Sequence, residues 1–509
     1  MTAKALMIQG TASDVGKSMI CTAFCRIFSD DGMKVVPFKS QNMALNSFVT
    51  IDGGEIGRAQ GVQAEAARVI ATTDMNPILL KPKQDMVSEV IVHGKHFMDM
   101  SATSYRNDFV EKAMPIVKQS IHKLQNDFDV MVLEGAGSPA EINLKDRDIA
   151  NMRMAHATDA AVILVADIER GGMFASIIGT LALLDDSERA RVKGIIINKF
   201  RGMRELLDDG VAWLEKETGI PVLGIIPYIQ VNIEAEDSLA LSSLRFKRPK
   251  QGEFPIDVAM IRLPRISNFT DVDPFFDEPE VGVRLVRHVK ELGEPDLLII
   301  PGTKNTIEDL QWLKDEGFAS AIQKLAKKGT SIFGICGGFQ LLGRELQDPY
   351  AVEGDGRSAT GLSLLPVTTI FNKDKKTVQM SGHTVSTIFD TMSLTGYEIH
   401  LGQTVIEDDH CVPFMKLSDG RCDGAIAMDG QVIGTYFHGI FNNQAFTRKM
   451  VNQLRVKKGL QPLDQQIQSD AERREAAYQL LADHVRQHID MERVYKMIGI
   501  PTRAQFDPS

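Results

Sequence analysis

Residues 331–340 are Ser-Ile-Phe-Gly-Ile-Cys-Gly-Gly-Phe-Gln, an apolar run that ends in a cysteine flanked by glycines. This pattern is typical of a nucleophile elbow, in which a strand carries the nucleophile to a sharp strand-to-helix turn. Gly334 and Gly338 tolerate the strained turn that a bulkier side chain would block. The amide of Gly337, at the start of the predicted helix, can stabilise a thiolate and the oxyanion of a tetrahedral intermediate. We therefore predict that Cys336 is a nucleophile in an α/β domain; the alternative is a packed core cysteine.

The composition indicates a globular chain that is too long for one core. Its 509 residues suggest two domains plus an appendage, and 43% hydrophobic with 24% charged residues is ordinary for such a protein. The formal net charge of -10 argues against a nucleic-acid partner.

Several features argue against export or membrane insertion. Residues 1–10 predict a short strand rather than a signal peptide, and no run of about 18 apolar residues occurs. Five cysteines without framework spacing fit a reducing compartment, and Cys411 and Cys422 lack the neighbours of a zinc site. We expect a cytoplasmic protein with no membrane partner.

The first half of the chain alternates β-rich runs with amphipathic segments, which predicts a doubly wound parallel sheet. The predicted strands are residues 5–9, 35–38, 130–134, 161–166, 194–198 and 222–226. A second α/β pattern runs from residue 256 through 296–301 and 331–336 to 430–441. The fold class is therefore α/β, with two domains.

The domain boundaries follow from these patterns. We expect a first domain over residues 1–235, a polar and basic linker over 236–255, a second domain over 256–445 and a helical appendage over 446–509. In the appendage, Ala477, Leu481, Val485 and Ile489 recur at helical spacing. They predict an apolar helix face that packs on a domain or on a second subunit.

A phosphate-binding motif follows the first predicted strand: Gly10-Thr11-Ala-Ser-Asp-Val-Gly16-Lys17-Ser18. Its glycines let backbone amides converge on phosphate oxygens, Lys17 supplies a cation, and the Ser18 hydroxyl can bind magnesium. Five residues rather than four separate the two glycines, a departure that resembles the nucleotide site of dethiobiotin synthetases.

Polar residues lie at or just after the carboxyl ends of later strands, where such sheets bind ligands. Glu134 follows an aliphatic run and can hold magnesium, although a plain strand-end acid remains the alternative. Asn198 ends another strand and can bind the edge of an adenine ring. Asp146 belongs to a charged cluster soon after the Glu134 loop, and such clusters are usually solvated.

Residues 39–47 are Lys-Ser-Gln-Asn-Met-Ala-Leu-Asn-Ser, rich in amides and hydroxyls but without helix or strand periodicity. A polar substrate with several carboxylates or amides would use such groups. This segment, together with residues 52–60, 75–82 and 167–172, closely resembles the cobyric acid synthase family. The likeness runs from Lys4 to about Phe441 and includes the phosphate-binding motif and the cysteine elbow.

The resemblance implies that the second domain is a class I glutamine amidotransferase domain. Cys336 would then attack the glutamine side-chain amide, and His438 would act as general base and acid. Gly302 and Gly337 would supply the oxyanion-hole amides, and Gln340 would help to bind glutamine. The acid that usually lies two residues after the histidine is replaced by Ile440, so the sequence predicts a Cys–His dyad and weak glutaminase activity until the other site is occupied.

The resemblance also implies that the first domain, similar to dethiobiotin synthetase, binds ATP and Mg²⁺. Lys17 and Lys39 would neutralise charge on the phosphates while a carboxylate is converted to an acyl phosphate. The substrate would be a corrinoid that is amidated at four carboxylates. Its expected contacts are Ser40, Gln41, Asn42, Asn46, Ser47 and Asp146. A homo-oligomer is compatible with the sequence.

Two rival functions stay open at this point. Cobyrinic acid a,c-diamide synthase has the same domains and chemistry but acts on two other carboxylates, and residues 39–47 argue against it. A nucleotide-switched binding module, similar to partition ATPases, would share the phosphate-binding motif but would have no use for Cys336.

Overall fold

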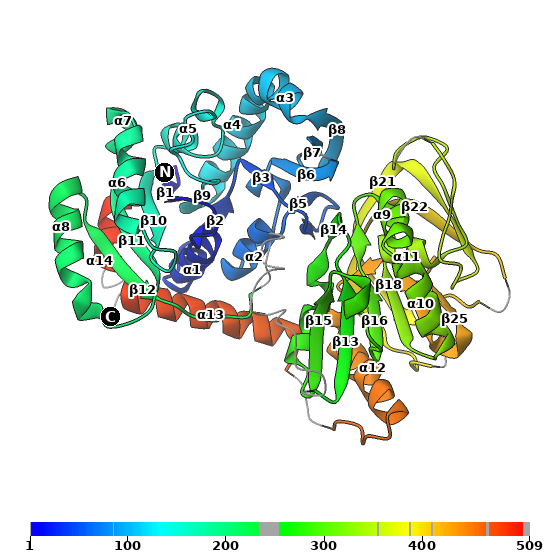
Figure 1. Ribbon diagram of the computed structural model, residues 1–509. Helices are drawn as coiled ribbons and strands as arrows, with labels where there is room; N and C mark the ends of the chain where they lie inside the picture. Colours follow the sequence, from blue (N-terminus) through cyan, green and yellow to red (C-terminus); the bar gives the residue numbers. More distant parts are fainter. Residues whose placement is uncertain are drawn as a thin grey trace.

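The computed structural model describes residues 2–84, 86–233, 254–353, 356–385, 388–408, 411–464 and 468–501. Nearly all of the predicted linker, residues 236–255, lies outside these ranges. We call residues 2–233 the N-terminal domain, residues 254–464 the C-terminal domain and residues 468–501 the tail (Figure 1).

The N-terminal domain is built on a six-stranded parallel sheet in the order β12-β11-β10-β1-β9-β2. Its strands are β1 (Lys4–Gly10), β2 (Val35–Phe38), β9 (Val130–Glu134), β10 (Ala161–Asp167), β11 (Val192–Phe200) and β12 (Val222–Pro227). Consecutive side chains of a strand point to opposite faces of the sheet, and both faces are buried. This explains the nearly continuous apolar runs in the sequences of these strands. The six predicted strands are confirmed.

Helices cover both faces of this sheet, as expected for a doubly wound fold. They are α1 (Lys17–Asp30), α2 (Arg58–Ala66), α4 (Val110–Asp127), α5 (Met152–Ala157), α6 (Met173–Leu183), α7 (Asp186–Arg189) and α8 (Asp208–Thr218). Leu6 and Ile8 pack on the side of α1, whereas Ala5 and Met7 pack on the side of α4 and α6.

A smaller four-stranded sheet, which we call the side sheet, faces the C-terminal domain (Figure 1). Its order is β3-β6-β7-β8, from β3 (Gln41–Met43), β6 (Ile78–Gln84), β7 (Val87–Val92) and β8 (Lys95–Ser101), and the short helix α3 (Ala102–Ser104) follows. The strands β4 (Ser47–Val49) and β5 (Glu55–Gly57) pair beside it. The prediction that residues 39–47 lack strand structure is therefore wrong, because β3 pairs with the distant strand β6 and Ser47 begins β4, which pairs with the nearby strand β5.

The C-terminal domain contains a second six-stranded sheet, in the order β15-β13-β16-β18-β26-β25, with only the β25–β26 pair antiparallel. Its strands are β13 (Ile256–Ile261), β15 (Val281–Val286), β16 (Leu297–Ile300), β18 (Ser331–Ile335), β25 (Ala425–Ala427) and β26 (Val432–Thr435). The helices α9 (Thr306–Asp315), α10 (Phe318–Lys327) and α11 (Gly337–Leu342) connect or follow these strands. The predicted α/β fold class with two parallel-type sheets is confirmed.

A largely antiparallel sheet, in which only the β19–β21 pair is parallel, covers one side of this domain and was not predicted. Its long strands are β21 (Val367–Thr384) and β22 (Ser393–Ile406), with β19 (Glu345–Gln347), β20 (Ala359–Thr360), β23 (Met415–Leu417), β24 (Cys422–Asp423) and β27 (Phe437–His438). The pair β14 (Ile266–Ser267) and β17 (Gly302–Thr303) leads into the 3-10 helix η7 (Phe269–Asp277).

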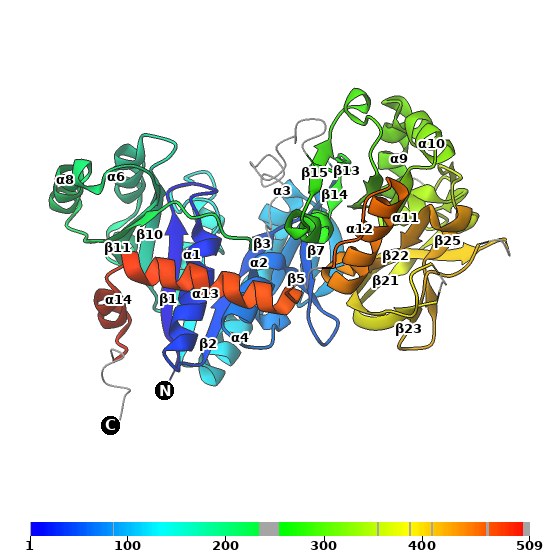
Figure 2. The ribbon, with the colours of Figure 1, turned by 90° about the horizontal axis from the view of Figure 1, so that it is seen from below.

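The helical end of the chain divides between the two domains. The helix α12 (Gln444–Lys457) packs into the C-terminal core through Phe446, Val451 and other apolar residues. The tail helices α13 (Asp470–His488) and α14 (Met491–Ile498) return to the N-terminal domain, where α13 crosses α1 (Figure 2). Leu481 and Val485 are buried there, which confirms the predicted apolar face.

The two domains are joined by a buried ionic cluster. Lys375 Nζ on β21 contacts Glu55 Oε2 at 2.6 Å and Glu89 Oε1 at 2.8 Å, and Lys304 Nζ contacts Glu89 Oε2 at 2.8 Å. Lys81 of the side sheet bonds the other oxygen of Glu55. Burial raises the pKa of Glu55, but Lys375 and Lys81 outweigh burial and hold that pKa well below its usual range. Glu55 therefore bridges Lys81 of its own domain to Lys375 of the C-terminal domain. Glu89 binds Lys375 and Lys304, which both come from the C-terminal domain.

Replacing Lys375 should uncouple the domains. In Lys375→Met, Glu55 and Glu89 each lose a buried cation, a loss that costs about 3–5 kcal/mol when one partner of a buried ion pair is removed. We expect the calorimetric unfolding trace to separate into two transitions. Lys373→Met, on the same strand at an exposed position, should change stability by no more than about 0.5 kcal/mol. Identical traces for the two variants would contradict the role of the cluster.

Candidate active sites

The strand β18 delivers Cys336 to the strand-to-helix turn that precedes α11. Cys336 has φ 52° and ψ -108°, a sparsely populated conformation for a residue with a side chain. Packing enforces this turn, because a Cβ atom on Gly338 would lie 1.9 Å from the carbonyl oxygen of Ile300. Cys336 is 8% exposed, and its Sγ contacts the carbonyl oxygen of Ile399 at 3.5 Å. The thiol is therefore held at the edge of the sheet, where Cys336 packs against the C-terminal core.

His438 on β27 faces this thiol and is held by an acid that the sequence prediction missed. Its Nδ1 lies 2.7 Å from Oδ2 of Asp271, which comes from η7, and the side chains interact in a fully buried setting. Burial lowers the pKa of His438, but the charges of Asp271 and Cys336 outweigh burial and raise that pKa to about 10. The predicted dyad is thus wrong: Ile440 is not an acid, yet Asp271 takes the orienting place from a different part of the chain.

The other residues predicted for this site gather around the same point. A Cβ atom on Gly302 would lie 3.2 Å from Cε1 of His438, and one on Gly337 would lie 2.9 Å from the amide nitrogen of Thr303. The lack of a side chain at both positions therefore lets Gly302 lie close to His438, and lets Gly337, the residue after Cys336, lie close to Thr303. Gln340 accepts from Thr306 Oγ1 at 2.9 Å and donates to the Tyr436 hydroxyl at 3.2 Å.

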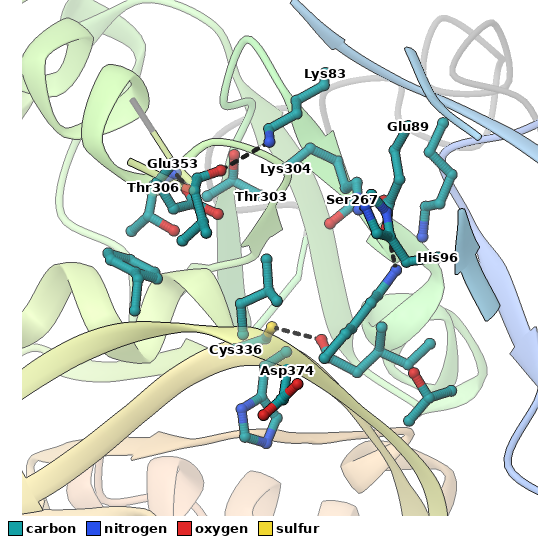
Figure 3. A pocket seen from close by; sticks show the side chains of 18 of the residues that line it. Lys83, Glu89, His96, Ser267, Thr303, Lys304, Thr306, Cys336, Glu353 and Asp374 are labelled. Carbon is teal, nitrogen blue, oxygen red and sulfur yellow. Dashed lines mark hydrogen bonds and ion pairs between the residues drawn. The ribbon is translucent and has the colours of Figure 1, made fainter. Parts of the chain in front are cut away.

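Cys336 and Gln340 line a cavity of about 590 Å³ between the two domains, which we call the thiol cavity (Figure 3). Its C-terminal wall also contains Thr303, Lys304 and Glu353, and its N-terminal wall contains Lys81, Glu89 and His96. Burial raises the pKa of Glu353 to about 7. The ionic cluster therefore forms part of the wall opposite the thiol.

The phosphate-binding motif forms a loop between β1 and α1, and Lys17 is directed into it. Lys17 Nζ donates to the carbonyl oxygens of Ala12 and Gly137, each at 2.9 Å, and burial lowers the pKa of Lys17 to about 8. Gly16 has φ 103°, and a Cβ atom there would lie 2.2 Å from Asn198 Nδ2. Asn198 Nδ2 donates to the Val15 carbonyl oxygen at 2.8 Å, so this side chain holds the loop from the adjacent strand end. Gly10 and Thr11 lie at the end of β1 where the loop begins.

Glu134 connects the residues predicted to bind a metal and phosphates. Its Oε1 accepts from Ser18 Oγ at 2.8 Å and from Lys39 Nζ at 2.9 Å, and its Oε2 accepts from Gln63 Nε2 at 2.6 Å. Burial raises the pKa of Glu134, but Lys39 and these hydrogen bonds outweigh burial and lower it. One carboxylate and one hydroxyl suit Mg²⁺, which usually takes one or two protein oxygens besides phosphate. The described residues contain no group of three or more His, Cys, Asp or Glu that could hold a metal alone.

A second cavity, of about 1120 Å³, lies in the N-terminal domain, and we call it the N-terminal cavity. Gln41 and Asp146 line it, together with Gly137, the residue whose carbonyl oxygen contacts Lys17. Tyr105 on its wall donates to Gln41 Oε1 at 2.6 Å. The cavity therefore extends up to the phosphate-binding loop.

The remaining residues predicted to contact a corrinoid lie elsewhere. Ser40 bonds the carbonyl oxygen of Ile149, and Asn42 Nδ2 donates to Gln60 Oε1 at 2.9 Å. Asn46 and Ser47 are buried at the domain interface. These four side chains are engaged with protein groups, and none of them is among the residues lining the N-terminal cavity.

The side sheet separates the two cavities. Leu80, Ser88 and Val90 line the N-terminal cavity, whereas Lys81 and Glu89, their neighbours in the chain, line the thiol cavity. Alternate residues of a strand point to opposite faces, so the same strands form both walls.

Comparisons with known proteins agree with this two-site arrangement. The model of a CobB/CobQ-like glutamine amidotransferase domain matches residues 257–446, and the model of a CobQ/CobB/MinD/ParA nucleotide binding domain matches residues 6–240. The chain is 51% identical over 496 residues to a cobyric acid synthase of Geobacillus sp. (strain WCH70), which covers 97% of each chain. It is 51% identical over 492 residues to that of Anoxybacillus flavithermus, covering 96% of each chain, and 48% identical over 504 residues to that of Streptococcus sanguinis, covering 97% and 99%. Within the described ranges, no helix is long and apolar enough to cross a membrane.

Removing the charge of Asp271 should make the thiol less reactive. In Asp271→Asn, the pKa of His438 falls because the charge that raises it is gone, so less imidazolium is present near neutral pH to assist the reaction of Cys336. We expect iodoacetamide to alkylate Cys336 at least about tenfold more slowly at pH 7, the factor that one pKa unit gives. Peptide-resolved mass spectrometry measures this rate.

A matched control is Asp374→Asn, an exposed acid that lines the same cavity. It should leave the alkylation rate of Cys336 unchanged. If the two substitutions slowed alkylation equally, the overall negative charge near the cavity would set the reactivity of Cys336, and the contact between Asp271 and His438 would not.

Proposed function

Because this chain belongs to the cobyric acid synthase family, we propose that it amidates the b, d, e and g carboxylates of adenosylcobyrinic acid a,c-diamide to give adenosylcobyric acid. The chain is a glutamine-dependent amidotransferase with a nucleotide-binding domain. The observation that carries the proposal is the strained Cys336 beside a histidine that a buried aspartate orients, open to a cavity shared with the nucleotide-binding domain. Cobyrinic acid a,c-diamide synthase, the nearer rival, is not favoured by the relatives.

The C-terminal domain supplies ammonia. Cys336 Sγ attacks the carboxamide carbon of glutamine, and His438 takes the thiol proton and then delivers it to the departing ammonia. The amides near Gly302 and Gly337 stabilise the oxyanion of the tetrahedral intermediate. Water then hydrolyses the thioester to glutamate and restores the thiol. Asp271 keeps Nδ1 of His438 protonated, so that Nε2 is the nitrogen that exchanges the proton.

The N-terminal domain activates the acceptor. A corrinoid carboxylate oxygen takes the γ-phosphoryl group of ATP, which leaves ADP and an acyl phosphate, and ammonia then displaces phosphate to form the amide. Lys17 and Lys39 neutralise the charge that develops on the transferred group. Ser18 and Glu134 would hold Mg²⁺, which would supply further charge neutralisation on the phosphates. Gly10, Thr11 and Gly16 shape the loop, and Asn198 supports it.

The N-terminal cavity is the site that suits the corrinoid. Its wall combines apolar residues such as Leu80 and Met100 with the amide of Gln41 and the charge of Asp146. An apolar macrocycle with polar arms needs both kinds of surface. Because the cavity reaches Gly137 beside Lys17, a carboxylate arm can approach the phosphate-binding loop from it. We assign direct contacts to Gln41 and Asp146, and supporting roles to Ser40, Asn42, Asn46 and Ser47.

Replacing Cys336 separates the two half-reactions. Cys336→Ser should reduce glutamine-dependent amide formation at least about a thousandfold, because removing a nucleophile leaves only binding and oxyanion stabilisation. Synthesis with ammonium chloride should continue at the wild-type rate. Cys422→Ser, which removes the exposed cysteine, is the matched control and should leave both rates unchanged.

The product mass tests the acceptor. After reaction with ATP, Mg²⁺ and glutamine, adenosylcobyrinic acid a,c-diamide should gain four amides. Two amides added to cobyrinic acid, with none added to the a,c-diamide, would instead establish the rival synthase. No ammonia-dependent amide from any corrinoid would refute the function.

A further inference from the structure

Glu353 is a buried acid in the wall of the thiol cavity that the proposed mechanism does not use. It is 6% exposed and lines the same cavity as Cys336 (Figure 3). Burial raises the pKa of Glu353 to about 7, and the N–H of Thr306 and the charges of nearby lysines offset burial only in part. Burying a carboxylate is costly unless a cation or hydrogen-bond donors compensate, so an acid in this setting is a candidate for contact with a ligand.

A strained loop presents this carboxylate to the cavity. The N–H groups of Val352 and Glu353 donate to Asp348 Oδ1 at 2.8 Å and Oδ2 at 3.0 Å. Ala351 has φ 53°, a left-handed conformation that is rare for a residue with a side chain. From the N-terminal domain, Lys83 Nζ donates to the carbonyl oxygen of Val352 at 2.7 Å. The loop that carries Glu353 is therefore held from both domains.

A chain of hydrogen bonds connects Glu353 to the nucleophile. Glu353 Oε2 accepts from the amide N–H of Thr306 at 2.5 Å, and Thr306 Oγ1 donates to Gln340 Oε1 at 2.9 Å. The amide N–H of Gln340 in turn donates to the carbonyl oxygen of Cys336 at 3.1 Å. A molecule that has one end at Cys336 Sγ and extends past Gln340 therefore approaches this carboxylate with its other end.

Four acids among the described residues line the thiol cavity, Glu89, Asp99, Glu353 and Asp374, and their surroundings differ. Glu89 and Asp99 are paired with lysines, and Asp374 is exposed. Within the described part of the chain, Glu353 has no ion-pair partner, and only its Oε2 accepts a hydrogen bond. Glu353 is therefore the acid of this wall that suits a cation on a ligand.

L-Glutamine carries such a cation at the end remote from its carboxamide, because its α-carbon bears an ammonium and a carboxylate group. A carboxylate recognises an ammonium group through short, charge-assisted hydrogen bonds. Other charged groups of the cavity wall include Lys83, Lys95 and Lys373, which repel an ammonium group and attract a carboxylate. The distribution of charge therefore favours the α-ammonium group at Glu353 and the α-carboxylate on the side of the lysines.

We propose that Glu353 binds the α-ammonium group of glutamine and so selects glutamine among carboxamides. Its Oε1 accepts from the ammonium group while its Oε2 keeps the bond to Thr306, and the carboxamide carbon then lies at Cys336 Sγ. The ammonium group supplies the cation that the described residues do not give to Glu353. This inference rests on the proposed attack of Cys336 on glutamine and names a specificity-determining residue for that step.

A purely structural role for Glu353 predicts a different outcome. Because Thr306 is the first residue of α9, Glu353 also satisfies an N–H group at the start of that helix. Glu353→Gln keeps an oxygen for this N–H group but removes the charge. A defect at the helix start would affect every carboxamide substrate alike, whereas loss of the ammonium contact affects only substrates that carry the ammonium group.

Comparing glutamine with glutaramate tests the proposal, since glutaramate has a hydrogen in place of the α-ammonium group. Cys336 cleaves the same carbon–nitrogen bond in both, and mass spectrometry measures the glutamate or glutarate released with ATP, Mg²⁺ and adenosylcobyrinic acid a,c-diamide present. In the wild type, kcat/KM for glutamine should exceed that for glutaramate at least about tenfold, the effect of one charge-assisted hydrogen bond. In Glu353→Gln, kcat/KM for glutamine should fall at least about tenfold, whereas that for glutaramate should change less than about twofold.

Asp374→Asn is the matched control, since it removes an exposed negative charge from the same cavity. It should keep the wild-type preference for glutamine. Equal losses with both substrates in Glu353→Gln would overturn the proposal and leave only the contact with the start of α9. The wild type alone gives a second test, because a preference for glutamine of less than about twofold would also overturn the proposal.

The same reactions separate this inference from the proposed function. Glutamine hydrolysis that depends on Cys336 but does not distinguish the two substrates would overturn the inference and leave the proposed function standing. Glutamine hydrolysis at an unchanged rate in Cys336→Ser would refute the proposed role of the thiol, and the inference with it. A preference for glutamine that is lost in Glu353→Gln, without any amide formed on the corrinoid, would support the inference and refute the proposed acceptor.

Discussion

The ionic cluster between the domains is the interaction on which the rest of the molecule depends. Glu55 and Glu89 are buried, and their charges are tolerable only because Lys375 and Lys304 reach them from the other domain. If the two domains separated, water would have to solvate the charged groups that each domain contributes to the cluster. The joined form also creates the thiol cavity, whose walls come from both domains.

The fold was predictable where the chain repeats a simple physical pattern. The strands of the parallel sheets are buried on both faces, so they appear as apolar runs such as residues 161–166, and the helices between them keep a helical period. The hairpin of β21 and β22 and the side sheet lack this signal. Their strands alternate polar and apolar residues or pair with distant partners, as β3 does with β6, and pairing of that kind is decided by tertiary contacts.

The candidate sites were predictable where a single turn carries the chemistry. The elbow at Cys336 and the loop ending in Lys17 and Ser18 each depend on residues close together in sequence. Asp271 could not be found in this way, because it meets His438 across 167 positions and belongs to no local motif. Its only signal is an acid soon after a strand, a weak feature shared by many surface residues. The polar segment 39–47 was assigned wholly to ligand contacts, but burial of Asn46 and Ser47 gives part of it to the interface.

The side sheet imposes a constraint on how such a protein can change over time. The strands β6 and β7 line the N-terminal cavity with Leu80 and Ser88 and the thiol cavity with Lys81 and Glu89. The two cavities therefore share one wall. Inserting or deleting one residue in either strand would exchange the two sets of side chains, placing lysine and glutamate in the wall of the N-terminal cavity and apolar groups opposite the thiol. The shared wall therefore admits substitutions one face at a time but not changes in length, so we expect its strands to keep a fixed length while the loops around them vary.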